Sequence, residues 1–291
     1  MRVSASAYDP TRAFANGFLT KMGVHVTYFD PLIGAGIDSL FKDNTKLVLT
    51  ETPGSLTFEI SDLPALCKVA KKHGAYVIAD NTWATPLLFN PLEYGADISV
   101  HAATKYLGGH SDVMLGTATA NKRTFKKLQR TAFQLGHTVS ADDASLVLRG
   151  LRTLGIRLKQ HEENALILAA WLSERPEVDT VLHPAFETCP GHEIWERDFA
   201  GSSGLFSIVL KGGDYADTAA LVDDMKLFKM GFSWGGFESL ILPSNPASAR
   251  TAVPWQSVGP VIRLHIGLEN TDDLIADLQA GLERYSAKIG S

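Results

Sequence analysis

In the first 120 residues, short apolar runs alternate with amphipathic stretches. Each apolar run is bounded by glycine, proline or polar residues, as is typical of a strand that ends at a turn. Residues 61–74 instead carry apolar side chains at helical spacing, with Ser61 or Asp62 as N-cap and Gly74 as C-cap. Strands that alternate with helices indicate an α/β domain with a mainly parallel sheet. The predicted strands lie within residues 21–30, 46–54, 75–83, 95–106 and 113–120.

The second half begins with a long stretch, residues 121–177, in which the apolar residues follow helical spacing. We expect this stretch to bridge to a second domain. Beyond it, predicted strands within residues 180–184, 205–212 and 261–268 alternate with predicted helices at 214–228 and 272–285. We therefore predict a large domain over residues 1–150, and a bridging helix with a smaller α+β domain over residues 151–291.

Composition narrows the classes of function. The chain of 291 residues is 45% hydrophobic and 20% charged, which is ordinary for a soluble globular enzyme. Its net charge of -5 argues against nucleic acid as the main partner, because phosphate binding needs a basic face. No apolar run approaches the ~18–20 residues that span a bilayer, and the first residues lack the order of a secretory signal. These features favour a cytoplasmic enzyme with a small-molecule substrate.

Neither cysteines nor histidines indicate a metal site. The two cysteines, Cys67 and Cys189, give no disulfide framework and no ligand spacing. Cys67 lies in the apolar stripe of the predicted helix, so we expect a small buried residue. The histidines show no H-x-x-x-H spacing, and we assign no metal.

The segment HAATKYLGGHSD, residues 101–112, contains the first candidate for chemistry. Lys105 follows a predicted strand and precedes Gly108 and Gly109. Open α/β sheets bind ligands at the carboxyl edge of their strands, where this lysine would lie. Taken alone, a surface lysine beside a turn is the commoner explanation.

Asp80 strengthens the case for Lys105. It ends the apolar strand VIAD, 25 residues before the lysine, and a carboxylate there is costly unless it is paired or hydrogen-bonded. A protonated pyridine nitrogen of pyridoxal phosphate (PLP) is such a partner. The alternative is an aspartate that caps the turn toward Trp83. Thr104 offers a hydroxyl to the cofactor's phosphate, although it could equally be an ordinary strand threonine.

Longer motifs point the same way. ADNTWATP, HAATKYLGGHSD and GTA resemble the cofactor-binding core of the Cys/Met-metabolism PLP enzymes. YFDPLIGAGI, ETPGS, RGLRTLGIRLKQH, GSSGLFSIVL, SWGGFESL and IRLHIGLE resemble, more narrowly, its branch of bacterial cystathionine β-lyases. The similarity extends over essentially the whole chain. It implies a fold type I, PLP-dependent transferase-like architecture, with a mainly parallel large domain of the seven-stranded type and a smaller α+β domain.

The resemblance also implies roles for individual residues. Lys105 would hold PLP as a Schiff base and act as the catalytic group, Asp80 would face the pyridine nitrogen, and Thr104 would contact the phosphate. Arg263 would bind the substrate carboxylate, although an arginine on the outer face of an edge strand is the default explanation. Ser233 and Trp234 would line the substrate pocket, and the tryptophan could instead be part of the core.

The implied reaction is β-elimination of L-cystathionine to homocysteine, pyruvate and ammonia, with cysteine S-conjugates as further substrates. Two departures from the wider family favour the β-lyase branch: Ala102 stands where many relatives have serine, and Ser55 stands where γ-type relatives have asparagine. Cystathionine γ-lyase, γ-synthase and cysteine desulfhydrase remain alternatives on the same fold. A non-enzymatic scaffold that binds full-length relatives is another.

The match to the family begins partway through it, at SASAYDPT. About the first quarter of a typical member would then be absent, and with it a tyrosine that stacks on the cofactor, a phosphate-binding turn, and groups lent to a neighbouring subunit. We therefore expect a fragment of a homotetrameric enzyme. His110 and Asp112 could form a catalytic dyad, but hydrogen bonding within the loop is the more common role for such residues.

Overall fold

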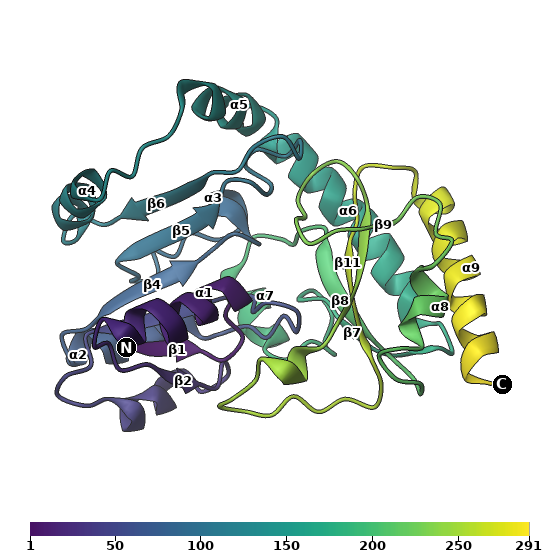
Figure 1. The fold of residues 1–291 in the computed structure, drawn as a ribbon, viewed down its shortest axis with the longest axis horizontal. Coiled ribbons are helices and arrows are strands. Elements are labelled where there is room, and N and C mark those ends of the chain that lie inside the picture. The colour runs from purple at the N-terminus through teal and green to yellow at the C-terminus, as the bar shows by residue number, and fades with distance from the viewer. Residues whose placement is uncertain (291) are drawn as a thin grey trace.

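The computed structural model describes residues 1–290, which form two sheets lying side by side (Figure 1). The first sheet has the strand order β2-β1-β3-β4-β5-β6. Four of its five strand pairings are parallel, and only β5 with β6 is antiparallel. Its strands are β1 (Arg2–Ser4), β2 (Thr27–Phe29), β3 (Leu47–Glu51), β4 (Tyr76–Asp80), β5 (Ile98–Ala102) and β6 (Gly116–Ala120). Among residues 1–290 this sheet has six strands, one fewer than the seven-stranded type expected from the resemblance.

Helix α2 (Leu63–Lys72) follows the prediction closely. The Asp62 carboxylate caps it by accepting the Ala65 N–H at 3.1 Å. Gly74, with φ of 68°, lies just beyond its end, where only glycine adopts this backbone easily. Cys67 is buried in the apolar face of α2, as predicted. The other helices of this half are α1 (Asp9–Phe14), η1 (Ala15–Leu19), η2 (Gly34–Leu40), α3 (Thr85–Leu88), α4 (Phe125–Gln134) and α5 (Ala141–Leu151).

The second sheet has the strand order β7-β8-β11-β10-β9. Its strands are β7 (Val178–Leu182), β8 (Leu205–Leu210), β9 (Lys229–Met230), β10 (Leu240–Ser244) and β11 (Val261–His265). The helices of this half are α6 (Leu154–Ser173), α7 (His192–Asp198), α8 (Thr218–Val222), η3 (Pro246–Ser248) and α9 (Thr271–Ile289). An apolar cluster between this sheet and helices α6, α8 and α9 includes Leu168, Phe206 and Leu278.

Two helix predictions were too long. The stretch 121–177 divides into α4, α5 and α6, with Gly136 at a φ of 68° after α4 and a turn at Arg152 and Thr153 before α6. The predicted helix 214–228 shrinks to α8. The second half of the predicted stretch is not helical, because the Asp277 carboxylate accepts the backbone N–H groups of residues 226–228. A distant side chain has replaced the local helical bonds.

One core cluster joins the two sheets. It contains Leu66 and Val77 from the first half, Leu205 and Val261 from the second, and Trp83 from the loop after β4. The Trp83 indole donates to the Leu205 carbonyl oxygen at 2.8 Å, which satisfies its polar atom inside the core. The two sheets are therefore fixed against each other at this place. The predicted domain boundary near residue 150 stays a prediction.

Candidate active site

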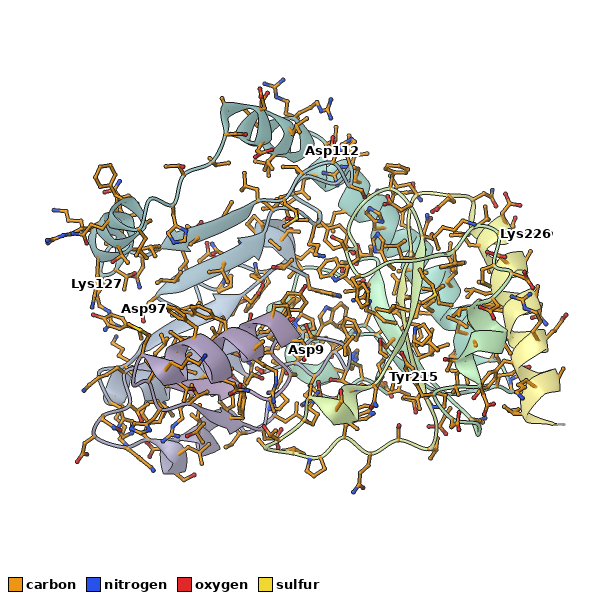
Figure 2. All side chains as sticks on the ribbon, in the orientation of Figure 1. Asp9, Asp97, Asp112, Lys127, Tyr215 and Lys226 are labelled. Atoms are coloured by element: carbon orange, nitrogen blue, oxygen red, sulfur yellow. The ribbon has the colours of Figure 1, made fainter. Side chains whose placement is uncertain are left out.

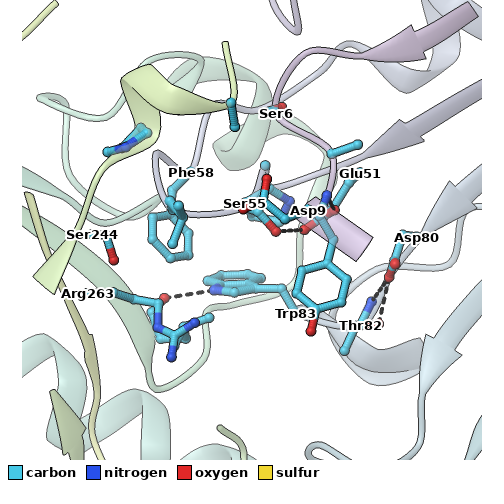
Figure 3. Close-up of a pocket in the computed structure, with 18 of the residues that line it drawn as sticks. Ser6, Asp9, Glu51, Ser55, Phe58, Asp80, Thr82, Trp83, Ser244 and Arg263 are labelled. Carbon is cyan, nitrogen blue, oxygen red and sulfur yellow. Dashed lines mark hydrogen bonds between the residues drawn. The ribbon is translucent and has the colours of Figure 1, made fainter. Parts of the chain in front are cut away.

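A cavity of about 460 Å³ lies where the carboxyl ends of β3, β4 and β5 face the second sheet. This volume is within the usual range for a small-molecule site. Figure 3 shows its wall, with Glu51 and Asp80 on one side and Ser244 and Arg263 on the other. Chain segments remote in sequence contribute lining residues to it. Most of these residues lie within 5–10, 51–58, 80–83 and 242–250, and the others are Ala102, Lys105, Leu205, Phe232, Trp234 and Arg263.

Lys105 lies in the turn that follows β5, three residues beyond the end of the strand. The turn is closed by the Lys105 N–H, which donates to the Ala102 oxygen at 2.9 Å. Its Nζ donates to Ser233 Oγ at 2.8 Å and lies 5.1 Å from the centre of the Trp234 ring. Burial, with the charge of Arg263, lowers the pKa of Lys105 to about 8. About a tenth of this amine is therefore uncharged at pH 7, on the order of a hundredfold more than for an ordinary lysine, and the uncharged form is the one that acts as nucleophile or base.

Asp80 ends β4 and lines the same cavity as Lys105. Its Oδ1 accepts the Thr82 N–H at 3.0 Å and the Thr82 hydroxyl at 2.6 Å (Figure 3). Burial raises the pKa of Asp80, and these two hydrogen bonds from Thr82 oppose the rise. The turn-capping role is thus present, and it also fixes the direction in which the carboxylate points. Thr82 accepts the Ala102 N–H at 2.9 Å as well, which ties the ends of β4 and β5 together.

Glu51 was not predicted from the sequence. It is the last residue of β3 and pairs in register with Asp80 on β4. Its carboxylate accepts the Ser55 hydroxyl at 2.5 Å and the Tyr8 N–H at 2.6 Å. Burial and the nearby Asp80 charge raise the pKa of Glu51 well above its usual range. The sequence signal for Glu51 was that the strand LVLTE, residues 47–51, ends in a carboxylate, as VIAD does.

Arg263 lies on β11, the central strand of the second sheet, and is buried. The edge-strand alternative is therefore wrong. Its Nη2 donates to the carbonyl oxygens of Gly231 and Phe232 at 2.9 and 3.0 Å, which aims the guanidinium at the cavity wall. Burial lowers the pKa of Arg263 to about 10. Ser233 contacts the lysine, and Trp234 both lines the cavity and packs against the core.

Thr104 is placed differently from the other candidates. Its hydroxyl accepts the Leu115 N–H at 3.0 Å and donates to the Leu115 oxygen at 3.4 Å. It therefore joins the turn to the chain before β6, and it is not among the residues that line the cavity. Its contact with a phosphate stays a prediction.

His110 and Asp112 do not form a dyad. The His110 ring bonds to the Gly108 carbonyl oxygen at 2.8 Å, and Asp112 pairs with Arg149 of α5 at 3.3 Å. Figure 2 shows Asp112 beside the connection between α5 and α6, whereas Asp9, which lines the cavity, lies near the middle of the view. The loop role that we favoured is confirmed for His110, whereas Asp112 forms an ion pair with a helix residue instead.

The donor set of the cavity suits PLP. The cofactor needs a lysine amine for its aldehyde and a carboxylate for its pyridine nitrogen. Lys105 supplies an amine with a lowered pKa, and Asp80 supplies a buried carboxylate in the same cavity. The buried carboxylate would gain a cationic partner, which is the compensation that a buried charge requires.

Comparison with known proteins agrees with this geometry. The family described as "Cys/Met metabolism PLP-dependent enzyme" matches residues 1–283. The chain belongs to this family. Cystathionine β-lyase of Haemophilus influenzae is 50% identical over 98% of this chain and 73% of the relative. Cystathionine β-lyase of Escherichia coli is 49% identical over 96% of this chain and 72% of the relative.

A solved structure gives the same answer for the fold. Cystathionine γ-synthase of Xanthomonas oryzae, in complex with aminoacrylate and cysteine, superposes with a TM-score of 0.89 at 36% identity, over 99% of this chain and 76% of that chain. The predicted family, fold type and PLP cofactor are confirmed, as is the class of enzyme, a PLP-dependent carbon–sulfur lyase. The substrates of this chain are small molecules of the amino-acid class. Within residues 1–290, no helix has both the length and the apolar character to cross a bilayer.

Proposed function

We propose that this chain catalyses β-elimination of L-cystathionine to homocysteine, pyruvate and ammonia. The observation that carries the proposal is that Lys105 and Asp80 line one cavity, with Arg263 in the wall opposite the first sheet. The two relatives compared above are named for this reaction and share about half of their residues with the chain. The proposal extends to the site residues: Lys105 as catalytic group, Asp80 and Thr104 toward the cofactor, and Arg263, Ser233 and Trp234 toward the substrate.

The first role is to hold the substrate. A guanidinium binds a carboxylate through two parallel hydrogen bonds. Arg263 uses Nη2 for the carbonyl oxygens of residues 231 and 232, so its remaining N–H groups can meet the α-carboxylate of an amino acid. Phe232 and Trp234 line the same cavity as Arg263 and give it an apolar wall.

The second role is to move a proton. Bound PLP supplies an electron-poor ring that accepts the electron pair left at Cα when its proton departs. Lys105, once freed by the incoming substrate amine, is the group placed to take that proton, and its pKa of about 8 gives it a larger basic fraction near neutral pH than an ordinary lysine has. Asp80 would hold a negative charge toward the ring nitrogen in a water-poor site, where such a charge acts most strongly. The thiolate would leave from Cβ as homocysteine, and the remaining three-carbon fragment would take up water to give pyruvate and ammonia.

The test compares the chain with its Lys105→Ala variant, with PLP present. L-Cystathionine should yield one pyruvate and one homocysteine thiol per turnover, and the variant should lose this activity by at least ~10²-fold. Lys72→Ala is the matched control, because Lys72 is an exposed lysine paired with Asp38. Pyruvate release that survives at parental rate in Lys105→Ala would refute the assignment.

γ-Cleavage is the second candidate, because a γ-synthase superposes on the chain at a TM-score of 0.89. It would give 2-oxobutyrate in place of pyruvate from the same substrate, so product analysis separates the two. The higher identity to the β-lyases, 50% against 36%, favours pyruvate. Activity on cysteine S-conjugates, the homotetramer and a cytoplasmic location stay predictions.

A further inference from the structure

A short segment from the second half of the chain packs directly on Lys105. This segment, residues 233–236, is called the SWGG segment below. Ser233 accepts from Lys105 Nζ, and the Trp234 ring lies beside the same amine. The backbone contact is tighter still: a Cβ added to Gly235 would lie 2.7 Å from Tyr106 N and 3.0 Å from Lys105 Cα. The position of the lysine thus depends on where this segment is held.

His265 contacts the backbone of the SWGG segment. It lies at the end of β11, is 1% exposed, and its Nε2 is 3.2 Å from the Gly235 nitrogen and 3.2 Å from the Gly236 oxygen. A backbone N–H can only donate, and a carbonyl oxygen can only accept. The ring nitrogen therefore accepts the Gly235 N–H when the ring proton lies on Nδ1, and it donates to the Gly236 oxygen when the proton lies on Nε2. In either tautomer Nε2 contacts the backbone of the SWGG segment.

The surroundings of His265 keep the ring neutral. Lys105 and Arg263 are the cations near it, His161 has its ring centre 5.2 Å away, and the Tyr106 ring is at 5.8 Å. Burial is the main reason why the pKa of His265 lies well below its usual range, and the positive charges of these neighbours lower it further. His161 uses Nδ1 to bond the Ile266 oxygen at 2.8 Å, so it too is fixed in one orientation against β11.

We propose that His265 is a positioning residue for Lys105: the contact of its Nε2 with the backbone of Gly235 and Gly236 holds the SWGG segment against the lysine. The inference rests on the proposed role of Lys105. Loss of this contact frees the segment, removes the Ser233 contact and admits water to the amine. A more solvated lysine regains a pKa closer to its ordinary value of about 10.4.

The test follows the capture of PLP by Lys105 as a function of pH, trapped with borohydride and located by mass spectrometry of the full chain. The condensation joins the amine nitrogen to the aldehyde carbon with loss of water, and borohydride reduces the new bond. In the parent chain the initial rate should be half-maximal near pH 8, the pKa of Lys105. His265→Leu should move this midpoint upward by about one pH unit, toward the ordinary lysine value. His265→Gln, whose amide can both donate and accept in place of Nε2, should keep the parental midpoint.

His183→Leu is the matched control. His183 is also fully buried, and its Nδ1 accepts the Ala185 N–H at 3.1 Å, but it is not among the residues that line the cavity. An unchanged midpoint in His265→Leu, or an equal shift in His183→Leu, would overturn the inference. A parent chain that takes no label at Lys105 would contradict the proposed function itself. If His265→Leu lacks the far-ultraviolet circular dichroism of the parent, His265→Asn replaces it, because its shorter amide does not reach Gly235.

Discussion

Glu51 and Asp80 stand side by side at the ends of two parallel strands, and both line the cavity. Ionisation of both carboxylates at this separation costs free energy, because their negative charges repel. One of the two is therefore expected to stay protonated. Glu51 accepts two hydrogen bonds from the segments around it, whereas Asp80 faces the place where a ring nitrogen would bind. We infer that Glu51 holds the proton and Asp80 the charge.

Glu51→Gln should therefore change how stability depends on pH. For a carboxyl group whose pKa is raised in the folded chain, its stabilising contribution is complete below the unfolded value of about 4.3 and is lost as pH rises through the folded value. Glutamine cannot ionise, so the fall in melting temperature from about pH 5 to about pH 8 should be shallower in the variant, without PLP. Glu163→Gln, in an exposed pair with Lys159, should keep the parental slope. Identical slopes for Glu51→Gln and parent would contradict the inference.

Lys105→Met should stabilise the chain in the absence of PLP. Burial lowers the pKa of this lysine, so the folded chain binds fewer protons than the unfolded chain above about pH 8, and its stability rises with pH toward about 10.4. Below that window the ammonium carries the full penalty of burial. At pH ~7 the methionine variant should gain on the order of 1 kcal/mol in urea unfolding, after allowance for the partial exposure of the lysine. The gain should vanish near pH ~10.4, and a gain that does not depend on pH would point to packing instead.

Gly235→Ala tests the close approach of the SWGG segment. The residue has a φ of 91°, and an added Cβ would meet the backbone of Lys105 and Tyr106. We expect a loss of stability of roughly 2 kcal/mol, from strain and displacement together. Lyase activity should fall further than the loss of folded protein explains. Gly116→Ala, with nothing within 4 Å of the added carbon, provides the comparison, and equal behaviour of the two variants would count against the close contact.

Arg250 and Glu59 form a buried ion pair at the cavity wall, at 2.6 Å, and Arg250 also contacts the Thr57 hydroxyl. Their side chains are only 5% and 8% exposed. Removal of one partner of such a pair leaves an uncompensated charge, so Glu59→Ala should cost about 3–5 kcal/mol in urea unfolding. The double variant Glu59→Leu, Arg250→Met should recover most of it. A cost below ~1 kcal/mol would mean that water screens the pair.

Local patterns in the sequence predicted what local physics determines. The cap at Asp62, the buried Cys67 and the strand that ends at Asp80 depend on neighbouring residues, and each was predicted correctly. The resemblance to the family supplied Arg263, whose central, buried position no pattern around VIRLH reveals.

The remainder required the tertiary structure. Glu51 becomes a candidate site residue only because it pairs in register with Asp80, and this pairing between strands is not visible in the local sequence. The end of the helix predicted at 214–228 depends on Asp277, about 50 residues away, which accepts the N–H groups that the helix would have used. His265 acts through the backbone of the SWGG segment, and that contact exists only once β11 and this segment are both in place.

The walls of the cavity come from both sheets, and this has a thermodynamic consequence. A molecule that binds there touches the ends of β3, β4 and β5 and the β10–β11 region at once, so its binding energy opposes separation of the two halves. Ligand should therefore merge the melting of both halves into one transition whose midpoint climbs with ligand concentration. Occupancy of the pocket would then be readable from heat capacity alone, without any assay of turnover.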